Sequence, residues 1–188
     1  MPPKTPITSI EVNLVSALRS TVRPVNSAIN SERTRLSGNA TDLLTMAVTA
    51  LASEFEPLVP HYFPALLNLC TRTNKVFITR AKAAITALVE NTHAPSIIHY
   101  SFVSITDKSV SLRLAAAETL LACLKTFNPP DLEKEQRAKE IEAAIKATAI
   151  DASADVRKVG KQLWEAYKIL LPARVHGYVF SNQYTRTS

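Results

Sequence analysis

The same seven-residue pattern occurs twice in this chain of 188 residues, and the two copies are 44 residues apart. Each copy begins with Asp, has Ser two positions later, and ends with an apolar residue followed by Arg. The copies are residues 107–113 (DKSVSLR) and residues 151–157 (DASADVR). A period of about 40–47 residues built from helix pairs is typical of HEAT-type repeats. The repeat therefore predicts an all-α HEAT-repeat solenoid, an architecture that presents extended surfaces to binding partners.

The composition agrees with a helical protein whose cysteines stay reduced. Only 3 glycines and 6% aromatic residues argue against a β-sandwich or barrel, while 46% hydrophobic residues suffice for a core. Two cysteines do not make a disulfide framework, and we expect Cys70 and Cys123 to be buried thiols on apolar helix faces. The chain opens without a secretory signal, and no apolar run reaches the ~20 residues of a membrane span. We therefore expect a cytosolic protein with no membrane partner.

Helical spacing of apolar residues predicts eight helices. They cover approximately residues 9–29, 33–53, 57–71, 75–91, 95–105, 109–127, 130–149 and 153–171. Short loops predict antiparallel pairs of consecutive helices, giving about four helix pairs, and residues 172–180 are compatible with part of a fifth. The predicted organisation is a disordered N-terminus over residues 1–8, a repeat domain over residues 9–177 and a loose tail over residues 178–188.

The formal net charge is +6, and the positive charge is unevenly distributed. Eight basic and four acidic residues lie in the turns inside the pairs, which are residues 30–35, 71–75, 106–113 and 151–158. One basic and five acidic residues lie in the links between pairs, which are residues 54–61, 91–97 and 127–135. This contrast predicts a basic edge formed by the turns, suited to an acidic partner.

Individual turn residues allow a structural and a functional interpretation. Arg113 and Arg157 each follow an Asp by six residues, so they can pair with Asp across neighbouring turns, contact a partner, or do both, since an Arg has five donors. Lys75 and Lys108 lie at or beside helix starts, where a cation opposes the helix dipole, so a binding role and a solvated position are both open. Ser109 is expected to cap its helix.

The sequence offers no pattern for chemistry. The four histidines lack metal-ligand spacing, the three glycines form no phosphate-binding loop, and no nucleophile motif occurs. We expect no catalytic, cofactor or metal site, and hence no enzyme. Trp164, beside Leu163 and Tyr167, is expected to pack in the core or between repeats.

Several segments together resemble the N-terminal-type TOG domain of the CLASP proteins, which are microtubule-associated regulators. The resemblance covers approximately residues 10–180, and its most specific part lies between residues 70 and 160. It is carried by the two seven-residue copies together with residues 52–57 (ASEFEP), 64–69 (PALLNL), 73–76 (TNKV) and 90–95 (ENTHAP).

The resemblance implies a HEAT-repeat domain whose turns bind tubulin or the microtubule lattice. It also implies a place in the cytoplasm on the cytoskeleton, including microtubules and the mitotic spindle, with a role in suppressing catastrophe and promoting rescue. The matching positions are Arg33, Arg35, Asn74, Lys75, Lys108, Ser109, Arg113 and Arg157. The family's first repeat is expected to be missing, because nothing before residue 9 could form it, and this would weaken tubulin binding.

Two other functions are compatible with the same residues. One is a general HEAT-repeat scaffold that binds an acidic protein. The other is a nucleic-acid-binding HEAT protein, which is disfavoured because few aromatic residues lie near the basic turns to stack on bases.

Overall fold

The computed structural model describes residues 9–175, and in that range the regular structure is helical without strands. The expectations for residues 1–8 and 178–188 lie outside the described residues. The chain divides into two compact units, Met1–Tyr100 and Ser101–Ser188. No helix in the described range is long and apolar enough to cross a membrane.

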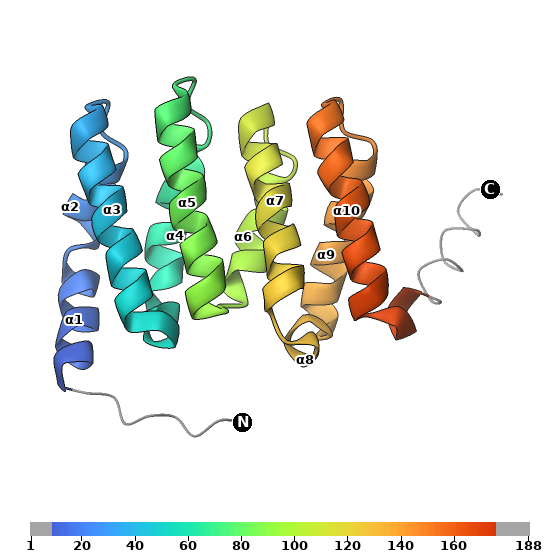
Figure 1. The fold of residues 1–188 in the computed structure, drawn as a ribbon, viewed down its shortest axis with the longest axis horizontal. Helices are drawn as coiled ribbons and strands as arrows, with labels where there is room; N and C mark the ends of the chain where they lie inside the picture. Colours follow the sequence, from blue (N-terminus) through green and yellow to red (C-terminus); the bar gives the residue numbers. More distant parts are fainter. Residues whose placement is uncertain (1–8, 176–188) are drawn as a thin grey trace. The chain divides into compact units, whose positions relative to one another are not determined.

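The first unit is built from antiparallel helices (Figure 1). Its elements are α1 (Ser9–Ser20), α2 (Val22–Ile29), α3 (Thr34–Leu51), the 3-10 helix η1 (Ala52–Leu58), α4 (Val59–Leu69), α5 (Lys75–Thr92) and the start of α6 (Ser96–Ser104). Helix α2 packs on α3, α4 packs on α5, and α3 packs on α5. Large side chains fill the centre, among them the fully buried Phe55, Tyr62, Phe63 and Leu66. The buried Tyr62 hydroxyl donates to the Leu18 carbonyl at 2.6 Å, which fastens α4 to α1.

Prolines explain where this unit departs from the predicted helices. The predicted helix over residues 9–29 is divided at Thr21, because Pro24 has no N–H to donate to the carbonyl of Ser20. The helix predicted over residues 57–71 begins later, at Val59, because the 3-10 helix η1 runs to Leu58 and contains Pro57. Pro60 then lies in the first turn of α4, where a missing N–H costs no helical hydrogen bond.

The second unit contains α7 (Val110–Thr126), α8 (Pro129–Leu132), α9 (Glu135–Ala149) and α10 (Ala154–Leu170). Helix α10 packs against both α7 and α9. The predicted helix over residues 130–149 is divided into α8 and α9 at Lys134, whose backbone (φ −54°, ψ 127°) lies outside the helical region. The Arg137 guanidinium donates to the Asp131 carbonyl at 2.7 Å and so satisfies the end of α8.

Both thiols lie where the sequence predicts. Cys70 and Cys123 are buried and are not joined in a disulfide. Complete burial raises the pKa of the Cys123 thiol well above its ordinary value, because the thiolate would lose its hydration.

Candidate functional site

In the first unit, the turns of two helix pairs are tied together by Arg72. Its guanidinium forms an ion pair with the Glu32 carboxylate and donates to the Asn30 carbonyl at 2.8 Å. The Asn68 side chain adds a hydrogen bond to the Asn30 side chain at 2.7 Å. These bonds hold the α2–α3 turn beside the α4–α5 turn.

Three cations project from the same end of this unit. Arg33, Arg35 and Lys75 are exposed, and within residues 9–175 their side chains form no hydrogen bond or ion pair. Arg33 is the N-cap of α3 and Lys75 is the first residue of α5, and neither helix has an acidic residue in its first turn. The positive end of each helix dipole therefore adds to the side-chain charge. The arrangement favours an anionic partner.

Asn74 has a local structural role beside these cations. Its side-chain oxygen accepts a hydrogen bond from the Val76 backbone N–H at 2.9 Å, which caps α5. An Asn N-cap contributes about 1 kcal/mol to helix stability. The cap places Lys75 at the very start of the helix, pointing away from the core.

In the second unit, the seven-residue pattern forms the same turn twice. In each copy the Asp side chain accepts from the Ser backbone N–H, at 2.7 Å for Asp107–Ser109 and 2.7 Å for Asp151–Ser153. In each copy the final Arg reaches back to two carbonyls of its own turn. Arg113 donates to residues 107 and 108 at 2.9 and 3.2 Å, and Arg157 donates to residues 151 and 152 at 2.6 and 2.8 Å.

A bidentate ion pair joins these two turns. Arg113 Nε lies 2.7 Å from Asp151 Oδ2, and Nη2 lies 2.9 Å from Oδ1. The two side chains are only 13% and 8% exposed. The hydrogen bond from Arg113 is the main reason that the pKa of Asp151 lies below its ordinary value. The predicted pairing of Asp and Arg across neighbouring turns is confirmed for Arg113.

The predicted site residues therefore divide into two groups. Arg113, Arg157, Asn74 and Ser109 shape the turns, and Ser109 also accepts the Leu112 N–H at 3.4 Å as the N-cap of α7. The residues whose charge is available to a partner are Arg33, Arg35 and Lys75 in the first unit and Lys108 in the second. Lys108 is exposed next to the α7 N-terminus, which has no acidic residue in its first turn.

Sequence reasoning missed the roles of two arginines in the first unit. Arg72 follows its partner Glu32 by 40 residues, a spacing close to the repeat period that could have indicated the pair. Arg80 lies across Gly38, and its Nη1 donates weakly to the Thr34 carbonyl at 3.4 Å. A Cβ on residue 38 would meet the Arg80 guanidinium, so this glycine makes room for it.

Comparison with known families gives a match over most of the chain. The model of the family described as CLASP N terminal matches residues 7–181. The Neurospora crassa protein stu-1 is 27% identical over 165 residues, covering 86% of this chain and 14% of its own length. The Aspergillus oryzae protein stu1 is 24% identical over 162 residues, covering 85% of this chain and 14% of its own length. The chain thus spans a small part of the curated relatives that it matches.

A solved structure shares the fold. The crystal structure of the MAST/Orbit N-terminal domain matches with a TM-score of 0.66 at 13% identity, covering 95% of this chain and 85% of the other. This likeness confirms the predicted all-α, TOG-like fold class.

Proposed function

Because the chain belongs to the CLASP N-terminal family, we propose that it is a non-catalytic module that binds tubulin or the microtubule lattice through the turns inside its helix pairs. The observation that carries the proposal is the set of exposed cations at those turns whose side chains form no hydrogen bond or ion pair within residues 9–175. These cations are Arg33, Arg35 and Lys75 in the first unit and Lys108 in the second.

The division of labour among the turn residues supports this function. Arg72 holds the α2–α3 turn, the Asn74 cap fixes the start of α5, and the ion pair of Arg113 with Asp151 joins the two turns of the second unit. The exposed lysines and arginines therefore extend from defined backbone positions. A preorganised charged surface loses less conformational entropy on binding than a loose one. Complementary charge also accelerates the encounter with an acidic protein. In the cell, this activity would place the protein on the microtubule cytoskeleton and the spindle, where it would suppress catastrophe and promote rescue.

The test is co-sedimentation with polymerised microtubules, together with binding to free tubulin. The variant Lys75→Glu/Lys108→Glu lowers the formal net charge from +6 to +2. The matched control Arg19→Glu/Lys125→Glu makes the same change at exposed helix ends away from these turns. We expect the first variant to lose binding and the control to retain most of it.

Two results would contradict the proposal. Equal loss in both variants would show that only the net charge matters. Binding of the wild type to duplex DNA but not to tubulin would favour the nucleic-acid alternative instead.

A further inference from the structure

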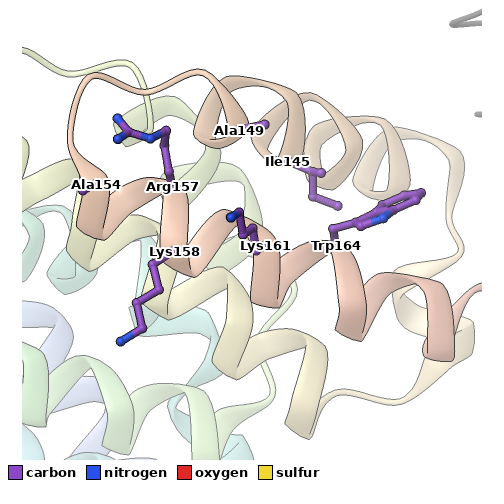
Figure 2. Close-up of a pocket in the computed structure, with 8 residues that line it drawn as sticks. Ile145, Ala149, Ala154, Arg157, Lys158, Lys161 and Trp164 are labelled. Carbon is purple, nitrogen blue, oxygen red and sulfur yellow. The ribbon is translucent and has the colours of Figure 1, made fainter.

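A pocket opens on the second unit along α9 and α10, with a volume of about 560 Å³ (Figure 2). It is lined by Ile145 and Ala149 of α9 and by Ala154, Arg157, Lys158, Gly160, Lys161 and Trp164 of α10. Figure 2 shows Ile145 and Trp164 at one end of the pocket and Ala154 and Arg157 toward the other. Lys161 lies between these two ends.

The indole at the apolar end of the pocket contacts two neighbouring side chains of α10. The Trp164 ring stacks on Tyr167, with ring centroids 6.2 Å apart and an interplanar angle of 20°. The Lys168 ammonium lies 5.6 Å from the Trp164 ring centroid. Trp164 packs on the buried Tyr167, as expected, and its ring remains partly exposed. A partly exposed indole beside Ile145 is a suitable contact for an apolar side chain.

The charge of the pocket has one sign. Its lining includes three cations and no carboxylate. The Arg157 guanidinium is bound to two carbonyls of its turn, whereas Lys158 and Lys161 have no hydrogen bond or ion pair within the described residues. Apolar surface with free ammonium groups beside it suits a ligand that carries both an apolar group and carboxylates.

We propose that this pocket binds an acidic peptide segment of a partner protein. An aromatic or branched apolar side chain of that peptide lies against Trp164 and Ile145, and its carboxylates pair with Lys161 and Lys158. The inference does not depend on tubulin as the partner, and its test uses residues outside the predicted tubulin-binding set.

The chemistry of the pocket counts against two other occupants. A second copy of the chain, docked by its own pocket, would bring the same cations face to face. The chain's own residues 176–188 contain no Asp or Glu and so offer no side-chain carboxylate to the lysines.

The experiment uses Trp164 as a reporter, because it is the only tryptophan of the chain. The whole protein is titrated with a short synthetic peptide of glutamates around one phenylalanine, and tryptophan fluorescence is recorded. We expect a saturable change that weakens at high salt. A peptide with Ser in place of Phe, and one with Lys in place of Glu, should each bind at least about threefold more weakly, since about 0.7 kcal/mol corresponds to that factor.

Variants locate the response in the pocket. Ala149→Glu and Lys161→Glu both change exposed residues, so folding should be preserved and is checked by circular dichroism. Both should weaken the peptide about threefold to tenfold or more, while Lys125→Glu, at the far end of α7, should not.

Several outcomes would overturn the proposal. Equal binding of the peptides with Phe and with Ser would show that the response comes from diffuse surface charge and not from the apolar end of the pocket. Trp164 emission could depend on protein concentration without responding to peptide, which would indicate a second copy. A single-stranded oligonucleotide could produce the response that the acidic peptide does not.

Discussion

Arg113 and Asp151 form a bidentate ion pair between the turns that begin α7 and α10, with N–O distances of 2.7 and 2.9 Å. The same guanidinium also donates to two carbonyls of its own turn. One side chain therefore fixes two turns at once.

Replacing Arg113 by Ala should lower the free energy of unfolding by about 1–3 kcal/mol, because Asp151 and two carbonyls lose their donor in a largely buried place. Lys108→Ala is the control in the same turn, and its exposed side chain should change stability by less than about 0.5 kcal/mol. Urea denaturation of both variants measures the difference. Equal stability of the two variants would contradict a structural role for the ion pair.

The same pair should make stability depend on acid. The folded-state pKa of Asp151 is lowered from its ordinary value of 3.8, chiefly by the hydrogen bond from Arg113. A carboxylate with a lowered pKa stabilises the fold above its unfolded-state pKa, and that contribution is lost as the pH falls through the folded-state pKa. The stability difference between wild type and Arg113→Ala should therefore be constant near neutral pH and shrink below about pH 4. A difference that persists unchanged in acid would mean that packing, and not charge, accounts for it.

The repeated seven-residue pattern was sufficient to predict these turns because their bonds are mostly local. Asp accepts from Ser two positions later, and Arg returns to carbonyls five or six positions earlier, so each copy contains its own turn. The helices near residues 75–91, 109–127 and 153–171 were predicted to within about two residues, since their apolar spacing is regular.

Other features depend on contacts that sequence spacing does not reveal. The ion pair of Arg72 and Glu32 joins different helix pairs, and Arg80 occupies the space above Gly38 on another helix. The break at Thr21 is not predicted for a different reason, because apolar residues follow one helical face on both sides of it. The pocket beside Trp164 arises from the packing of α9 on α10, which no single periodic stretch encodes.

Two glycines in helices should respond oppositely to alanine. A Cβ on residue 160 would lie 2.6 Å from Thr148 Oγ1 and 2.8 Å from its Cβ, so Gly160→Ala must push α10 away from α9. The expected cost of such overpacking is about 1–3 kcal/mol, partly offset by the roughly 1 kcal/mol that alanine gains in a helix.

Gly38 is the matched control. A Cβ there meets only the end of the flexible Arg80 side chain, which can turn away at the loss of one long hydrogen bond. Gly38→Ala should therefore be neutral or stabilising, with thermal unfolding as the measurement. A higher melting temperature for Gly160→Ala than for Gly38→Ala would refute the close helix contact.

The two thiols should react with an alkylating reagent only when the protein opens. Cys70 and Cys123 are buried, and burial raises the pKa of the Cys123 thiol, so little reactive thiolate exists in the folded state. Labelling followed by mass spectrometry should be slow under native conditions and rapid in denaturant. Rapid native labelling of Cys123 would show that α7 is accessible without unfolding.

Binding to an acidic partner should depend on the turn lysines of each unit separately. Lys75 and Lys108 are exposed and have no side-chain partner within the described residues, so reversing either charge should leave stability nearly unchanged. We expect Lys75→Glu and Lys108→Glu each to weaken tubulin binding about threefold to thirtyfold, since about 0.7–2 kcal/mol corresponds to these factors. We expect their effects to add in free energy, because the two lysines belong to different units and neither side chain has a partner within the described residues.

Salt separates a direct contact from a change in fold. Exposed charges are screened over about 8 Å at physiological ionic strength, so wild-type binding should weaken as salt rises, and each Glu variant should show a shallower dependence. Lys125→Glu carries the same charge change at the other end of the helix that follows Lys108, so it should retain the wild-type salt slope. If Lys108→Glu and Lys125→Glu weaken binding equally at every salt concentration, the turn of the second unit is not the contact surface.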